Sequence, residues 1–426
     1  MTPMLPVSRP RRRSRPIAML VHSYYEEDPR VRREAEALVA SGHEVDVFSL
    51  RRPGDGPRGV LDGVRITRLD VQRHQGSPIE TYLLEYADFT ARSMLALARA
   101  HRHRRYGLVQ VHTPPDFLVA AALPLRLLGV PVILDLHEAV PEFFRSRWPG
   151  LANGAILAGL AAVERVSIAM ATLALSVNQA RHDRLVRLGV PAGRLRVVTN
   201  GPVLARFDPT AHPTRAFMED GTLRLAYAGA LTPLYGLDDV LTAMARLATD
   251  RPELRVELDL YGRGDEQDRL ETRAAALGLA DRVHFRGRVP IGAVAGHLAA
   301  ADIVLSPIRR TRFSEISLST KAIEGAVMGK PVVAADMPTA RHYFPGEDLA
   351  WYAPDDPAGM AAAILRLVDD APARAATVAR ASVTARSLAW DREAQAYVTL
   401  VESLLRNRSS TVMSGAPDAR PARETP

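Results

Sequence analysis

The chain alternates short apolar runs with amphipathic segments, and this alternation predicts sheets covered by helices. An apolar run at residues 17–21 leads into a helical pattern from Pro29 to Ala40, and the run EVDVFSL follows. Apolar residues that recur every three or four positions mark an amphipathic helix, whereas short continuous apolar runs mark buried strands. The chain is therefore predicted to open as β-α-β.

The same alternation continues to about residue 200. The predicted elements are GLVQVH at 107–112, a helix over 116–128, PVILDLH at 131–137, a long helix after Leu151 and TLALSV at 172–177. Strands that are apolar throughout and separated by helices indicate a parallel sheet with both faces covered.

A polar stretch at 201–221 with three prolines and little periodicity interrupts the alternation. The alternation then restarts after residue 221. Its predicted strands are LRLAYAG, RVELDLYG, RVHFRG, ADIVLSP, KPVVAA and DLAWYA. We predict an α/β protein with two doubly wound parallel sheets in tandem: a domain at 17–200, a linker at 201–221, a domain at 222–389 and a helix at 390–406. Ligands of such sheets bind beyond the carboxyl ends of the strands, so two facing halves would form one cleft.

The amino-acid composition limits the kinds of catalytic and metal site that the chain can contain. The chain has 426 residues, which exceeds what one hydrophobic core usually serves. It has no cysteine, which excludes disulfides, thiolate metal sites and a cysteine nucleophile. No group of Asp and His residues stands at ligand spacing, so we expect no metal and no cofactor.

Most of the net charge of +7 lies in the tails. Residues 1–16 carry five arginines and no acid, so the body is close to neutral and a nucleic-acid groove is not expected. We expect disorder at 1–16 and at 407–426, with weak attraction of the first tail to anionic lipid as the alternative.

No segment is predicted to cross a membrane. The run IAMLV is too short for the core of a secretory signal, and the apolar stretch after Leu151 is interrupted by Glu164 and Arg165. We expect a cytoplasmic protein, with the inner face of the plasma membrane as the second candidate location.

The segment at 313–344 carries the most informative chemistry. Arginine outnumbers lysine 53 to 2, and both lysines, Lys321 and Lys330, fall here. A lysine in so biased a chain indicates a site for a compact ammonium. The serines before it could cap a helix over 318–328, whose positive end suits a pyrophosphate, with Lys321 as counter-charge. Glu324 lies on the same helical face and could accept both hydroxyls of a ribose, although an ordinary surface ion pair with Lys321 is the alternative.

The segment KAIEGAVMGKPVVA resembles the donor-binding motif of glycosyltransferase family 4, retaining enzymes of the GT-B fold with two Rossmann-like domains. Similar family segments follow in order along the chain: DPRVRREAEALVASGHEVDVFSL, VILDLHEAVPE, VVTNG, YAGALTPLYGLDDVLTAMARL and PDDPAGMAAAILRLVDD. The resemblance implies sugar transfer with retention from a nucleoside-diphosphate sugar to a carbohydrate, lipid-linked or small-molecule acceptor, in the synthesis of cell-envelope or extracellular glycoconjugates.

The resemblance implies that Gly229 and Glu324 bind the donor and that His137, with a catalytic role, faces the transferred sugar. We add Lys321 as a catalytic and donor-binding residue from its charge and its place near a helix start. The other candidates are Gly262 and Arg309 for the donor and Arg30, Asp116 and Glu138 for the acceptor side. Acceptor specificity is expected in exposed loops such as 51–60 and 72–80.

Two departures from the family pattern leave alternatives open. Ile316 stands where the family has the first of two glutamates, and Glu315 is off the expected face. Ala230 and Tyr235 replace the arginine and lysine of GRLxxxKG, so the phosphate charge would be met by Lys321 and by arginines at 309, 310 or 312. A sugar-nucleotide epimerase and an inactive sugar-nucleotide-binding scaffold are the alternatives. A dinucleotide oxidoreductase is disfavoured, because the first strand leads into a segment without glycines.

Overall fold

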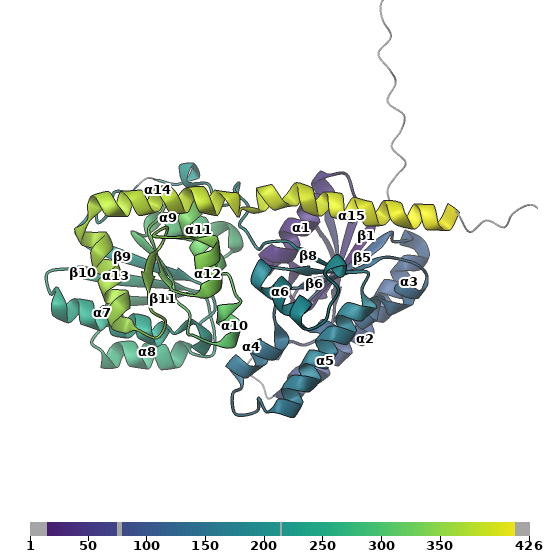
Figure 1. The fold of residues 1–426 in the computed structure, drawn as a ribbon, viewed down its shortest axis with the longest axis horizontal. Helices are drawn as coiled ribbons and strands as arrows, with labels where there is room; N and C mark the ends of the chain where they lie inside the picture. The colour runs from purple at the N-terminus through teal and green to yellow at the C-terminus, as the bar shows by residue number, and fades with distance from the viewer. Residues whose placement is uncertain (1–14, 75–78, 214, 414–426) are drawn as a thin grey trace, which may run out of the picture. The chain divides into compact units, whose positions relative to one another are not determined.

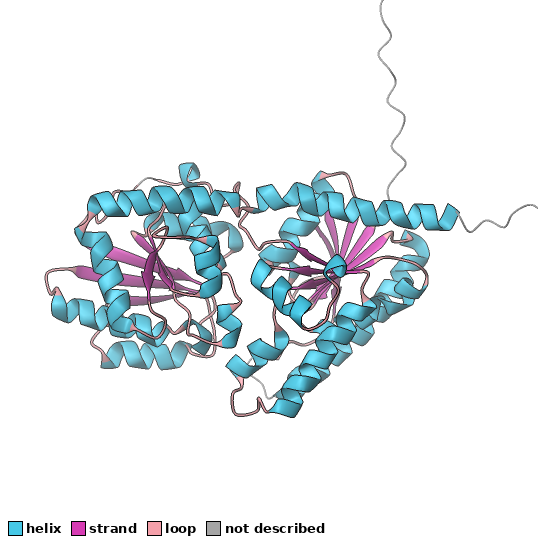
Figure 2. Cartoon of the chain, in the orientation of Figure 1, coloured by secondary structure: helices cyan, strands magenta, loops and turns pink. Residues whose placement is uncertain are grey.

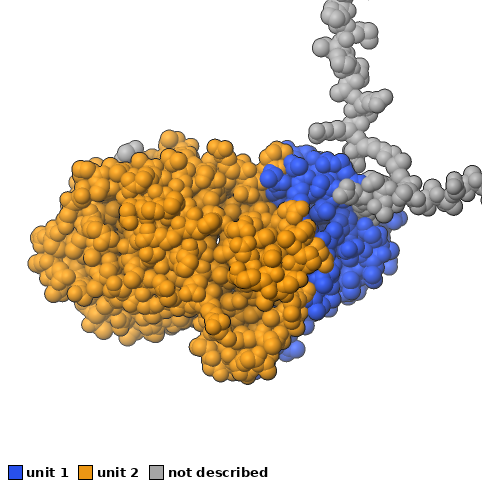
Figure 3. Space-filling model, in the orientation of Figure 1, with its two compact units in different colours: residues 1–135, 166–174, 396–426 blue, residues 136–165, 175–395 orange. Residues whose placement is uncertain are grey.

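The computed structural model describes residues 15–74, 79–213 and 215–413, and it contains two sheets with helices around each (Figures 1 and 2). The chain divides into two compact units (Figure 3). One comprises residues 1–135, 166–174 and 396–426, and the other residues 136–165 and 175–395. The prediction of two doubly wound parallel sheets is confirmed.

The first sheet has eight strands in the order β3-β4-β2-β1-β5-β6-β7-β8. The strands are β1 (Ile17–Val21), β2 (Val45–Leu50), β3 (Arg58–Leu61), β4 (Val64–Leu69), β5 (Leu108–His112), β6 (Val132–Leu136), β7 (Leu173–Ser176) and β8 (Leu195–Val197). β1 pairs in parallel with both β2 and β5, as the β-α-β pattern predicts, and β3 pairs antiparallel with β4 at the edge.

The helices of this half are α1 (Pro29–Ala40), α2 (Ile79–Arg104), α3 (Leu123–Leu127), α4 (Val140–Arg147), α5 (Gly154–Met170) and α6 (Gln179–Arg187). α1 has the predicted bounds because the Asp28 side chain accepts the Arg30 backbone N–H and Pro29 fits the first turn. The single helix predicted over 116–128 is instead a 3-10 segment, η2 (Asp116–Ala122), followed by α3. Pro124 explains the break, since proline is tolerated only in the first turn of a helix.

Several elements of the first half were not predicted, among them β3, β4 and α2. The strands β3 and β4 contain exposed and half-buried positions, so they lack the continuous apolar run that marks the predicted strands. β3 begins at Arg58, inside the segment expected to be an acceptor loop at 51–60. The helix α2 begins at Ile79, at the end of the other expected loop, and it buries Glu85 and Ser93 among its apolar residues, which weakens its amphipathic pattern. Residues 75–78 of that loop lie outside the described residues.

The second sheet has six strands in the order β11-β10-β9-β12-β13-β14, and every pair is parallel. The strands are β9 (Thr222–Ala228), β10 (Arg255–Tyr261), β11 (Val283–Gly287), β12 (Ile303–Ser306), β13 (Val332–Ala335) and β14 (Ala350–Tyr352). All six were predicted. Because the strands are parallel, their carboxyl ends share one edge of the sheet and their amino ends share the other.

The helices that follow β9 along the chain are α7 (Leu237–Asp250), α8 (Gln267–Ala276), α9 (Val294–Ala300), α10 (Arg312–Glu315), α11 (Thr320–Val327), α12 (Pro338–Tyr343), α13 (Pro357–Asp369), α14 (Ala371–Ser387) and α15 (Trp390–Met413), of which α15 belongs to the first unit from residue 396 on. α11 is held closely on the sheet. A Cβ at Gly325 would lie 2.9 Å from Val304 of β12, so only glycine permits this approach. Ile323 and Ala326 of the same helix are buried in the core.

The last helix, α15, begins at the predicted Trp390 but continues to Met413, beyond the predicted end at 406. The prediction of a disordered tail from 407 is therefore wrong for its first residues, and its remainder lies outside the described residues. So does the first tail, except for residues 15 and 16. Among the described residues, no helix is both long and apolar enough to span a membrane.

Candidate functional site

Two glycines form the floor of a site at the carboxyl edge of the second sheet. Gly229 follows β9 and Gly262 follows β10. The Gly229 N–H donates to the Tyr261 carbonyl at 2.8 Å, and the Gly262 N–H donates to the Gly287 carbonyl at 2.8 Å. A Cβ at Gly262 would overlap the Gly229 carbonyl oxygen, and its φ of +145° is one that side chains rarely adopt. The backbones at Gly229 and Gly262 can lie this close together only because both residues lack a side chain.

Lys321, the second residue of α11, lies directly against this floor. A Cβ at Gly229 would stand 2.9 Å from the Lys321 Nζ and would overlap its Cε. The Lys321 side chain is largely buried, at 9% exposed. The structure therefore brings together Gly229, Gly262 and Lys321, three of the residues expected to bind the donor.

Two tyrosines hold the Lys321 ammonium. The Nζ lies 3.8 Å from the ring centroid of Tyr235 and 5.3 Å from that of Tyr227. The Tyr227 hydroxyl is fixed by donating to the Ala230 carbonyl at 2.7 Å. An ammonium over an aromatic ring is attracted by the electron-rich face. Tyr235, which departs from the family pattern, thus contacts the lysine that we expected to supply the phosphate charge.

The beginning of α11 differs from the prediction in one respect. The helix begins at Thr320 and its N-cap is Ser319, but the Ser319 side chain makes no capping hydrogen bond. The Ser306 hydroxyl donates instead to the Ser319 Oγ at 2.8 Å. The first N–H groups of an α-helix have no intrahelical partner and attract anions. A helix start without a side-chain cap suits an anionic ligand better than a capped one.

Glu324 lies one turn further along α11. Burial raises the pKa of its carboxyl to about 7, although the nearby Lys321 ammonium and a hydrogen bond from Thr320 both lower it. Among the described residues, Lys321 and Glu324 form no ion pair within 4.0 Å, so the ordinary surface pair is not what the structure contains.

Arg309 is surrounded by carboxylates. Its Nη2 lies 2.7 Å from Asp238, and its Nη1 lies 3.5 Å from Asp355 and 3.8 Å from Asp239. Its charge is therefore matched within the protein, and Lys321 is the cation that the structure places against the glycine floor. The role assigned to Arg309 stays a prediction.

Arg181 was missed by the sequence reasoning, because nothing in NQARHDRL singles it out. Its guanidinium donates to the His137 carbonyl and, at 3.0 Å, to the Ser317 Oγ, and it lies 3.6 Å from the Glu138 carboxylate. Within its compact unit, Arg181 links the segment after β6 to the segment before α11. The buried His137 and half-buried Glu138 are thereby tied to the loop that leads into the helix of Lys321.

The acceptor-side residues Arg30 and Asp116 lie in the other compact unit. The Arg30 side chain pairs with Asp28 at 2.9 Å, at the beginning of α1. Asp116 is buried at the start of η2. Their assignment to an acceptor stays a prediction.

The chain matches known proteins along most of its length. Residues 222–370 match the family model described as glycosyl transferases group 1, and residues 28–201 match that of the glycosyl transferase 4-like domain. The chain is 30% identical over 383 residues to the D-inositol 3-phosphate glycosyltransferase of Streptomyces scabiei, covering 85% of this chain and 82% of that protein. It is 27% identical over 359 residues to a glycogen synthase of Mycobacterium tuberculosis, covering 81% and 83%.

Solved structures have the same fold. Sucrose-phosphate synthase from Thermosynechococcus elongatus superposes with a TM-score of 0.75 at 20% identity, and the match covers 92% of this chain and 100% of that one. Anabaena HepE in complex with UDP-glucose superposes with a TM-score of 0.67 at 17% identity, covering 91% and 99%.

Proposed function

We propose a donor, a site and a stereochemistry for this chain from one premise: the chain belongs to the glycosyltransferases of the group 1 and 4-like families, and it is a glycosyl-transferring enzyme of the GT-B fold. We propose that it takes a sugar from a nucleoside-diphosphate sugar. The donor binds at the carboxyl edge of the second sheet, and the product keeps the anomeric configuration of the donor.

One observation carries the proposal: the Lys321 ammonium is held between Gly229 and the ring of Tyr235 at the start of α11. A diphosphate placed there would meet a fixed positive charge and the positive end of a helix. Such preorganised charge stabilises the diphosphate most as the bond to the sugar breaks and the leaving group gains a third negative charge, which is the step that transfer must make easier.

Glu324 supports the nucleoside half of the donor. Its carboxylate lies one helical turn beyond Lys321, which suits a ribose attached to the diphosphate that Lys321 binds. A carboxylate accepts hydrogen bonds from two hydroxyls only when it has lost its proton.

The proposed reaction requires no nucleophile from the protein. The bond between the anomeric carbon and the diphosphate oxygen breaks, and its electron pair leaves with the diphosphate. The acceptor hydroxyl forms the new bond on the same face of the sugar and gives its proton to the leaving phosphate oxygen. We propose that the segment of His137 and Glu138 lies beside the transferred sugar, since Arg181 ties this segment to the loop before α11.

The relatives suggest which substrates to test first. One relative is named as a D-inositol 3-phosphate glycosyltransferase and another as a glycogen synthase, and the structure of HepE was solved with UDP-glucose. We propose a hexose as the transferred sugar and a carbohydrate, a lipid-linked sugar or a phosphorylated polyol as the acceptor, with the product used in cell-envelope or extracellular glycoconjugates.

The first experiment is a thermal-shift panel of uridine, adenosine and guanosine diphosphates and their glucose conjugates. We expect one base to raise the unfolding temperature of the wild type, and Lys321→Ala and Glu324→Ala to lose that shift. The exposed-residue variants Arg246→Ala and Glu271→Ala are matched controls and should keep it. No shift with any nucleotide would contradict the proposed donor. In a transfer assay, nucleotide binding without turnover for any acceptor would indicate a sugar-nucleotide-binding scaffold. A product with inverted anomeric configuration would refute the proposed retention.

A further inference from the structure

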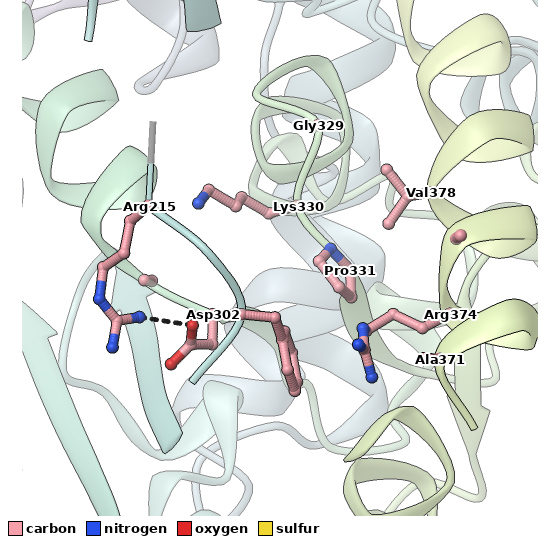
Figure 4. A pocket seen from close by; sticks show the side chains of 11 residues that line it. Arg215, Asp302, Gly329, Lys330, Pro331, Ala371, Arg374 and Val378 are labelled. Carbon is pink, nitrogen blue, oxygen red and sulfur yellow. Dashed lines mark hydrogen bonds and ion pairs between the residues drawn. The ribbon is translucent and has the colours of Figure 1, made fainter. Parts of the chain in front are cut away.

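A second pocket lies at the opposite edge of the same sheet. Its volume is about 240 Å³. It is bounded by the turns that precede β9, β12 and β13 and by the first two turns of α14, so it opens at the amino ends of the strands. Its polar lining residues are Arg215, Asp302, Lys330 and Arg374, and Phe217, Ala375 and Val378 give it an apolar side (Figure 4).

The single acid of this lining is already saturated. The Asp302 Oδ1 accepts the Met218 N–H at 2.9 Å and a hydrogen bond from Arg215, and its Oδ2 accepts the Arg224 N–H at 2.8 Å. A second Nη of Arg215 binds Asp220 at 2.9 Å. Arg215 and Asp302 therefore compensate each other, and among the described residues no ion pair neutralises Lys330 or Arg374.

Lys330 is a half-buried cation of this pocket. In the part of the chain that the structure describes, its ammonium has neither an ion pair nor a hydrogen bond. Burial lowers the pKa of this ammonium, and Asp302 opposes that effect. Its side chain extends toward Arg215 (Figure 4). An anion bound to this ammonium would offset the free-energy cost of holding its positive charge in a partly buried position.

Arg374 stands on the other side of the pocket and is held in place. Its guanidinium lies 3.8 Å from the centroid of the Phe217 ring, and its Nη1 donates to the carbonyls of Leu367 and Val368. Its Nε and Nη2 make no hydrogen bond among the described residues. A guanidinium fixed by stacking, with two donors free, is prepared to bind an oxyanion.

We propose that this pocket binds a small phosphate-bearing anion, with Lys330 and Arg374 as its charged contacts. The volume is below the range of about 300–1,000 Å³ that is usual for pockets of drug-sized ligands, so a nucleotide sugar does not fit. A single phosphate group with a short organic part does fit, because the apolar side formed by Phe217 and Val378 can cover that part. The site is separate from the donor site, since the two lie at opposite edges of the sheet.

The test is isothermal titration calorimetry of the full chain in a chloride buffer, with inorganic phosphate and, separately, with glycerol 1-phosphate. We expect a dissociation constant of roughly 1 mM or tighter for at least one of them. Binding of both assigns the pocket to phosphate monoesters, whereas binding of inorganic phosphate alone assigns it to the free anion.

Variants separate this pocket from the donor site. Lys330→Gln and Arg374→Gln should each weaken binding about tenfold or more, since each removes a charge-assisted hydrogen bond. Lys330→Arg should retain it, and so should Lys321→Ala and the exposed control Arg246→Gln. Unfolding temperatures of all variants check that they are folded. The proposal is overturned if neither anion binds at roughly 10 mM. It is also overturned if Lys330→Gln and Lys330→Arg both bind as the wild type does, or if both fail to bind. Loss of binding in Lys321→Ala would overturn it as well.

Discussion

Glu324 connects the stability of the protein to pH. Its pKa is raised by folding from 4.5 to about 7, chiefly by burial. The folded protein therefore holds a proton that the unfolded chain releases. The stability that this proton provides is fully present below pH 4.5 and is lost as the pH rises through about 7.

The first prediction follows from that sign. At pH 8, Glu324→Gln should be more stable than the wild type by roughly 2–3 kcal/mol, because it buries no charge, and at pH 5 the two should differ little. Urea denaturation at both pH values measures the difference. An equal difference at the two pH values would show that the carboxyl does not titrate in this range.

The second prediction concerns donor binding by the same residue. In the proposed donor site, ribose hydroxyls would donate to the ionised carboxyl of Glu324. Nucleotide affinity of the wild type should therefore fall as the pH drops from 8 to 6, and the midpoint should lie near 7. In Glu324→Gln, the affinity should be nearly constant over this range. Calorimetry with the nucleotide identified by the thermal-shift panel tests this, and a wild type without pH dependence would remove Glu324 from the ribose site.

The third prediction tests the aromatic support of Lys321. Tyr235→Phe keeps a ring under the ammonium, whereas Tyr235→Leu removes it. A cation–ring contact contributes about 0.5–2 kcal/mol, so the leucine variant should bind nucleotide roughly 3- to 30-fold more weakly and the phenylalanine variant nearly as the wild type does. Equal loss in both variants would instead assign the effect to the hydroxyl.

At the scale of elements, the glycine floor should be far less tolerant than glycines in open turns. Gly262→Ala would force a Cβ against the Gly229 carbonyl, whereas Gly278, also at positive φ, has nothing within 4 Å of such a Cβ. We expect Gly278→Ala to cost about 1 kcal/mol, from backbone strain alone, and Gly262→Ala to cost roughly 3 kcal/mol or more. Thermal and urea unfolding of the two variants provide the comparison, and equal costs would contradict the close backbone contact.

The elements also show what a sequence can predict. All strands with continuous apolar runs were found, because burial on both faces leaves an unambiguous pattern. The strand β3 was missed because it lies at a sheet edge, where exposed positions such as Val60, at 69% exposed, break that pattern. In the site, α11 and its Lys321 and Glu324 were predicted from residue type and spacing. The support from Tyr235 and the link through Arg181 depend on contacts between distant segments, which no local pattern contains.

At the scale of the whole molecule, the end of the chain completes the core of the first unit. The buried Tyr397 of α15 donates to the Gln110 Oε1 at 2.6 Å, and the amide of Gln110 donates to the buried Glu34 of α1. Residues from three distant parts of the sequence thus share one polar network in the interior of this unit.

The fifth prediction is that Tyr397→Phe destabilises the protein by about 1–3 kcal/mol, because it leaves the buried Gln110 oxygen without its donor. The slope of the urea transition should not change, since the surface exposed on unfolding is the same. Activity measured well below the unfolding temperature should be unaffected. A stability equal to that of the wild type would mean that water replaces the hydroxyl.

The glycine floor also has a consequence for how this enzyme can evolve. Gly229 and Gly262 contribute backbone alone, so no substitution at these positions can adjust the shape of the site without disturbing the sheet beneath it. In the proposed donor site, variation that changes the accepted donor must then come from the side chains around this floor, such as those of Tyr235 and Ser319. A library selected for a new sugar nucleotide should therefore keep both glycines while it diversifies those side chains, and the rigid base would let one scaffold serve many specificities.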